Sequence, residues 1–79
     1  MVEYNKNPED AGLSSKVRIA LKVNDATELY IKSVKVGTFK GTVHLMGEVP
    51  DEAAKRAIER VTRQCPDVYA LVNEIEVKH

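Results

Sequence analysis

Apolar and polar residues alternate through the middle of the chain, from residue 34 to residue 49. The apolar members of this pattern are Val34, Val36, Val43, Leu45 and Val49. Alternation of this kind is typical of half-buried β-strands. Between the two runs, Lys40-Gly41 provides a short turn, because glycine readily adopts the positive φ that such turns need. The stretch therefore predicts a β-hairpin with one buried face.

Gly41 and Gly47 are expected to be structural residues. Gly47 interrupts the apolar row of the second strand. A glycine inside a strand usually marks a bulge, or a position where another backbone or a helix comes very close. Gly41 is required by the turn itself. Backbone geometry therefore explains both glycines.

An amphipathic helix is predicted before the hairpin, from Leu13 to about Asn24. Its apolar stripe consists of Leu13, Val17, Ala20 and Leu21. This spacing places the four side chains on one helical face. Ser14 or Ser15 is the expected N-cap, and a start at Asn7 or Asp10 is the alternative.

A second helix is predicted after the hairpin, with Asp51 at its start. Its apolar stripe consists of Ala54, Ala57, Ile58, Val61 and Cys65. The opposite face carries Lys55, Arg56, Glu59, Arg60 and Arg63. Glu52–Arg56 and Glu59–Arg63 are favourable pairs spaced four residues apart. Because acidic residues interrupt the basic ones, a solvated helix face is favoured over a nucleic-acid surface, and nucleic acid is not an expected partner.

The last strand is predicted from Val68 to Val77, and its apolar positions change parity. Val68, Ala70 and Val72 are even, whereas Leu71, Ile75 and Val77 are odd. A regular strand cannot turn both sets inward, so we expect a bulge near Asn73.

These elements predict an α+β domain of order α-β-β-α-β. Two helices packed on one face of a small three-stranded mixed sheet would bury both apolar stripes. The last strand would lie parallel to one strand of the hairpin. Residues 1–12 are polar and without periodicity, so we expect a flexible N-terminal lead-in there and a domain over residues 13–77.

Ile19 and Val23 lie outside the apolar stripe of the first helix, close to Lys16 and Lys22. The favoured interpretation is that residues 25–32 fold back and cover them. The alternative is an exposed apolar strip edged by lysines, suited to a membrane surface or a partner. In that case Lys16, Ile19, Lys22 and Val23 are the candidate lipid or partner contacts.

The composition of the chain limits the classes of partner and compartment that can be expected. The chain has 79 residues with twelve basic and twelve acidic side chains, so its net charge gives no general case for nucleic acid or membrane. One cysteine excludes an internal disulfide. No apolar segment typical of a signal peptide follows Met1. If the natural chain begins at Met1, this favours the cytoplasm. If the protein is exported, its signal peptide has been removed from this sequence.

No group of residues in the sequence predicts an enzyme, a metal site or a cofactor. His44 alternates with buried positions and is expected to be solvated on the outer sheet face. Cys65 lies on an apolar stripe, where cysteine acts as a small hydrophobic residue. The segment Gly37-Thr38-Phe39-Lys40-Gly41-Thr42 lacks the ending of a phosphate loop and is expected to be a hairpin turn.

The ordered pattern resembles the BON domain, a module of bacterial osmotically induced periplasmic and nodulation proteins. The matching positions are Leu13-x-x-x-Val17-x-x-Ala20-Leu21, Val34-x-Val36, Gly41-x-Val43-x-Leu45-x-Gly47-x-Val49, Ala54, Ala57, Val61, and Val68-x-x-x-Val72-Asn73-x-Ile75-x-Val77. Two turns depart from it: Pro66-Asp67-Val68 replaces a Gly-Val pair, and Gly37-Thr38-Phe39-Lys40 replaces a tighter turn.

The resemblance implies a non-catalytic binding module of the periplasm or cell envelope. Such domains are linked to phospholipid surfaces and to envelope integrity under osmotic and other stress. The alternative is a protein–protein or oligomerisation module that docks other envelope proteins or a second BON domain. Its contact surface would be the edge of the hairpin, or the sheet face that carries Lys35, Phe39, Thr42, His44 and Met46. A further alternative is a ligand- or ion-sensing domain of a larger protein.

Overall fold

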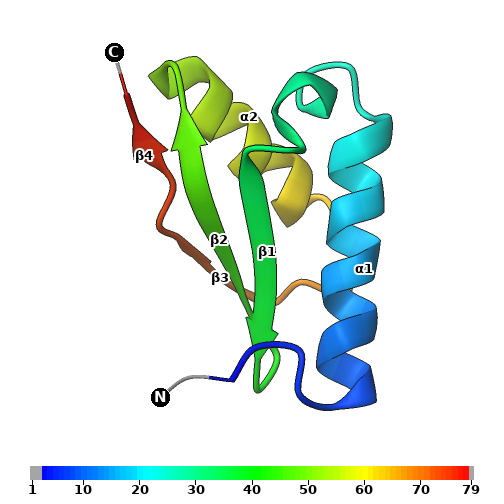
Figure 1. The fold of residues 1–79 in the computed structure, drawn as a ribbon. Coiled ribbons are helices and arrows are strands. Elements are labelled where there is room, and N and C mark those ends of the chain that lie inside the picture. The colour runs from blue at the N-terminus through cyan, green and yellow to red at the C-terminus, as the bar shows by residue number, and fades with distance from the viewer. Residues whose placement is uncertain (1–2, 79) are drawn as a thin grey trace.

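The computed structural model describes residues 3–78 and confirms the α+β class and the order of elements (Figure 1). The elements are α1 (Pro8–Val23), the short 3₁₀ helix η1 (Glu28–Tyr30), β1 (Val34–Phe39), β2 (Thr42–Val49), α2 (Glu52–Arg63), β3 (Ala70–Asn73) and β4 (Glu76–Val77). The predicted last strand is thus two short strands in line.

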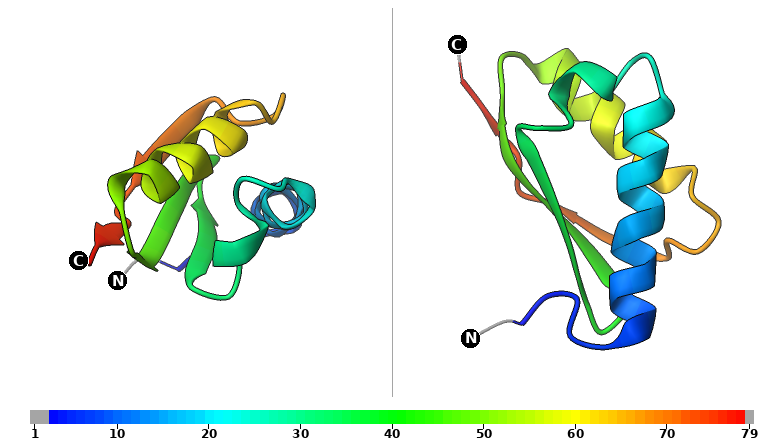
Figure 2. Two further views of the ribbon diagram at one scale, coloured as in Figure 1. Left: turned by 90° about the horizontal axis from the view of Figure 1, so that it is seen from above. Right: turned by 45° about the vertical axis from the view of Figure 1, so that its right-hand side comes forward.

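The sheet is built around β2, which pairs antiparallel with β1 and parallel with both β3 and β4. Both helices pack on one face, α1 along β1 and α2 against β2 and β4 (Figure 2). The buried core between the helices and the sheet consists of Val17, Leu21, Val34, Val36, Val43, Leu45, Val49, Ala54, Ile58, Val61 and Ile75. The predicted two-layer arrangement is therefore confirmed.

The start of α1 differs from the expected one. The helix begins at Pro8, and Asn7 is its N-cap, with its side-chain oxygen accepting from the amide of Asp10 at 2.8 Å. Ser14 is not a cap but a buried helical residue. The first turn carries no apolar stripe, so periodicity could not reveal it, and residues 8–12 are helix where a flexible lead-in was expected.

The start of α2 agrees with the prediction. Asp51 is the N-cap and accepts from the amide of Ala54 at 2.8 Å. Of the two predicted ion pairs, Glu59–Arg63 forms at 3.4 Å. Within residues 3–78 no ion pair joins Glu52 to Arg56.

The predicted bulge near Asn73 is wrong. Thr42 of β2 is level with Ala70, and Glu48 is level with Glu76, so the register is the same in β3 and β4 and no residue is inserted. The regular alternation of inward and outward side chains therefore continues through this segment. Asn73 points inward, and Val72 points outward and is 40% exposed. Asn73 tolerates this position because its oxygen accepts from the amide of Ile75 at 3.1 Å.

The hairpin glycines have the predicted structural roles. Lys40 and Gly41 have φ of 49° and 84°, which are the positive values that a tight two-residue hairpin turn requires. Gly47 has φ of 128°. A Cβ at this position would lie 2.1 Å from the backbone oxygen of Ser33, so Gly47 permits a close approach of the preceding strand.

Candidate functional site

The outer side of α1 carries an exposed apolar strip. Ile19 is 61% exposed and Val23 is 72% exposed. The expectation that residues 25–32 cover these two side chains is therefore wrong. Leu29, an apolar residue of that segment, is itself 82% exposed in η1. We call Ile19 and Val23, with the exposed Lys22 between them, the α1 strip.

Lys16 is engaged elsewhere. Its Nζ lies 2.7 Å from Oδ2 of Asp67, in the loop between α2 and β3. The hydrogen bond to Asp67 and the charge of that carboxylate raise the pKa of Lys16 above its ordinary value. Four sequence-predicted contact residues thus separate into the three of the α1 strip and one lysine that ties α1 to a loop.

Two further residues beside the α1 strip, one basic and one apolar, were not predicted from the sequence. Arg18 and Ile31 line a shallow groove of about 310 Å³ together with Ile19 and Lys22. Arg18 was readable as the neighbour of Ile19 on a helix. Ile31 was not, because only the fold brings the segment after η1 back to α1.

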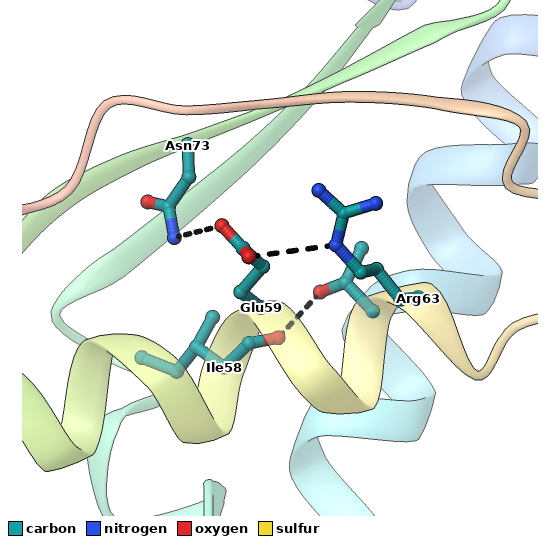
Figure 3. Close-up of polar contacts among 5 residues, drawn as sticks. Ile58, Glu59, Arg63 and Asn73 are labelled. Carbon is teal, nitrogen blue, oxygen red and sulfur yellow. Dashed lines mark hydrogen bonds and ion pairs between the residues drawn. The ribbon is translucent and has the colours of Figure 1, made fainter.

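A second groove, of about 480 Å³, runs along α2 beside β3. Its lining residues are Glu52, Lys55, Arg56, Glu59, Arg60, Arg63, Gln64 and Asn73. We call this the arginine groove. Glu59 is held at its edge by two contacts, from Nδ2 of Asn73 at 3.2 Å and from Nε of Arg63 at 3.4 Å (Figure 3).

The α1 strip and the arginine groove are neighbours on the helical layer. Val23 borders a hollow of about 340 Å³ between α1 and α2, and Gln64 lines that hollow as well. Gln64 also lines the arginine groove. Gln64 therefore borders both the arginine groove and a hollow that Val23 of the α1 strip also lines.

The outer face of the sheet is partly covered by the N-terminal segment. The ring of Tyr4 lies 5.1 Å from that of His44, and Nδ1 of His44 lies 3.3 Å from Oε1 of Glu74. The His44 side chain is only 18% exposed, so the expectation of a solvated histidine is wrong. Tyr4 covers it because Gly37, on the neighbouring strand, leaves room for the tyrosine ring.

Cys65 is partly buried against the core, close to its predicted position. Burial, and secondarily the charge of Asp67, raise the pKa of its thiol. Such an environment disfavours the reactive thiolate.

Within residues 3–78 no cluster of histidine, cysteine and acidic residues is suited to hold a metal ion. Over the same range, none of the helices has the length and apolar character needed to cross a bilayer.

Comparison with known proteins identifies the module. The family model described as BON domain matches residues 9–79, which is nearly the whole chain. A search of curated proteins finds no match. BON domains are non-enzymatic binding domains that are typically periplasmic or associated with the envelope. The match and the α-β-β-α-β fold agree with the resemblance of the sequence, and the chain belongs to the BON domain family.

Proposed function

We propose that this BON domain binds the phospholipid surface of the bacterial envelope through the α1 strip and so supports envelope integrity under stress. The observation that carries the proposal is the exposure of Ile19 and Val23 beside Lys22 on one side of a helix. Apolar residues flanked by cations on a helix are the arrangement with which peripheral proteins enter the interface of a bilayer.

The expected affinity is modest. Burying an aliphatic side chain contributes about 1.5 kcal/mol or more. A lysine near an anionic surface adds about 1 kcal/mol. Ile19, Val23 and Lys22 together therefore support weak, reversible binding, which neighbouring domains or a second copy would strengthen through avidity. Lys16 adds less than a free lysine as long as Asp67 holds it.

The test is co-sedimentation with vesicles of phosphatidylglycerol and phosphatidylcholine at low and physiological salt. We expect the double variant Ile19→Ser/Val23→Ser to bind at least about tenfold more weakly, because the apolar contribution is lost. Both residues are exposed, so its thermal midpoint should match that of the wild type.

The control replaces another exposed apolar side chain, that of Tyr69, by serine. This variant should bind vesicles like the wild type. Equal binding by the wild type and Ile19→Ser/Val23→Ser would overturn the role of the α1 strip, and an absence of wild-type binding to any vesicle would overturn the proposed function.

A second candidate function is association with another copy of the domain through the outer sheet face. Its support is the exposure of Val72, at 40%, on the outer side of β3. We expect the mass in solution, measured by light scattering, to rise with concentration for the wild type and to stay monomeric for Val72→Ser. A wild type that is monomeric at every concentration contradicts this candidate.

A further inference from the structure

We infer that the arginine groove of α2 is a phosphate subsite that receives the headgroup of a phospholipid in the membrane entered by the α1 strip. This inference rests on the proposed function and deepens it. It assigns the recognition of the anionic headgroup to α2, an element that the sequence pattern treated only as a solvated face.

The groove contains the right chemistry for an oxyanion. Arg56, Arg60 and Arg63 line it, spaced four and three residues apart on α2. Helical residues at these spacings lie on adjacent turns, about 5–6 Å apart at Cβ. Guanidinium groups match the geometry of phosphate oxygens with two parallel hydrogen bonds. Two arginines can thus contact a single phosphate.

The acidic residue that interrupts this face does not block the groove. Both carboxylate oxygens of Glu59 are engaged, Oε1 by Asn73 and Oε2 by Arg63. Figure 3 shows the carboxylate between these two partners, with only Nε of Arg63 joined to it by a dashed line. Glu59 therefore orients Arg63 by its Nε and leaves the other donors of the guanidinium for a ligand.

The position of the groove fits a lipid better than an isolated ion. Gln64 borders both the arginine groove and the hollow next to Val23. A phosphate bound by the arginines would thus be separated from Val23 of the α1 strip by Gln64 and this hollow. The groove also supplies the charge that Lys16 does not, because Lys16 is bound to Asp67.

The test compares two double variants of equal net charge. Arg56→Gln/Arg60→Gln removes two groove cations and leaves the Glu59–Arg63 and Glu59–Asn73 contacts intact. Lys35→Gln/Lys40→Gln removes two exposed cations elsewhere that, like Arg56 and Arg60, form no ion pair within residues 3–78. With phosphatidylglycerol vesicles at low salt, we expect the groove variant to bind about 25-fold more weakly, which corresponds to about 1 kcal/mol for each cation. The lysine variant should bind within about twofold of the wild type.

A second arm identifies the source of the phosphate. Inorganic phosphate is titrated into the ¹⁵N-labelled wild type while amide shifts are followed by NMR. Shifts of residues 59–64 and 73 that are absent in the groove variant would show a subsite that also takes free phosphate. No such shifts, with vesicle binding still dependent on the arginines, would show that the lipid headgroup is required.

The two proposals fail separately. If the wild type binds no vesicle but phosphate shifts the groove amides, the membrane function and the lipid headgroup as ligand are wrong, and only a site for free phosphate remains. If the groove variant binds vesicles as well as the lysine variant does, the subsite is wrong while the α1 strip remains. A circular dichroism melt confirms that each variant is folded before these comparisons are made.

Discussion

Replacing Gly47 by alanine is expected to remove a large part of the domain's stability. The new Cβ would lie 2.1 Å from the backbone oxygen of Ser33 and 3.1 Å from the Cα of Val34. These are atoms of the neighbouring backbone, held in place by the pairing of Val34 with Gly47, so no change of side-chain rotamer relieves the overlap. The positive φ of 128° strains any residue with a Cβ.

The size of this effect follows from the size of the domain. A strained backbone conformation alone costs about 1–3 kcal/mol. With the overlap included, we expect a loss of about 4 kcal/mol or more, in the range reserved for the most damaging substitutions. A domain of 79 residues has a total stability of about 4–12 kcal/mol at ~0.05–0.15 kcal/mol per residue. Urea denaturation followed by circular dichroism measures the loss.

The control is Gly12→Ala, which adds the same methyl group inside α1, where no atom lies within 4 Å of the new Cβ. There alanine should stabilise the domain by about 0.5–1 kcal/mol, because it has the higher helix propensity. Similar urea midpoints for the two alanine variants would contradict the steric role of Gly47.

The parts of the fold that the sequence predicted are those governed by local periodicity. Alternation identified the hairpin, and the apolar stripe ending at Cys65 identified α2, because each pattern depends on neighbours within a few residues. The position of Ile19 and Val23 outside the apolar stripe of α1 was also readable from helical geometry. Whether another segment covers these two residues could not be read from the sequence, because that depends on where η1 places Leu29.

The errors come from polar residues that the fold satisfies at a distance. An inward Asn73 violates the rule that sheet interiors are apolar, yet its amide reaches Glu59 on α2 and its oxygen accepts from the amide of Ile75. Because these hydrogen bonds satisfy the buried amide of Asn73, the strand can turn this residue inward without a bulge. Likewise, Lys16 meets Asp67 across 51 residues of sequence, a pairing that no local pattern contains.

The N-terminal segment was misjudged for the same reason. The amide of Asn5 donates to the oxygen of Thr38 at 2.8 Å, and the amide of Thr38 donates to the side-chain oxygen of Asn5 at 3.0 Å. Ser14 lies 2.7 Å from the Thr38 hydroxyl. Asn5 thereby pairs with part of the free edge of β1, which an unpaired strand would otherwise expose. Single polar residues carry these contacts, so hydropathy gives no signal for them.

Asp10 forms a second set of polar contacts, between the start of α1 and the hairpin turn. It is 6% exposed, in the first turn of α1. Its carboxylate accepts from the amide of Lys40 at 3.0 Å, from the amide of Gly41 at 3.1 Å, and from the side-chain amide of Asn7 at 3.1 Å. A single carboxylate therefore satisfies two amides of a turn whose residues both have positive φ, and helps to hold the hairpin against the start of the helix.

Replacing Asp10 by asparagine should cost about 2–3 kcal/mol, because hydrogen bonds to a charged acceptor contribute about 1.5–3 kcal/mol and the new NH₂ group faces an amide donor. Glu9→Gln is the matched control: it removes the same charge from the same helical turn at an exposed position, and should cost at most about 1 kcal/mol through the helix dipole. Urea midpoints measure both losses, and hydrogen exchange should accelerate at the amides of Lys40 and Gly41 only in Asp10→Asn. Equal losses in the two variants would mean that Asp10 acts through its charge on the helix alone. A larger loss with selective exchange at the turn would establish that this carboxylate fixes the hairpin, and with it the orientation of the sheet beneath α1.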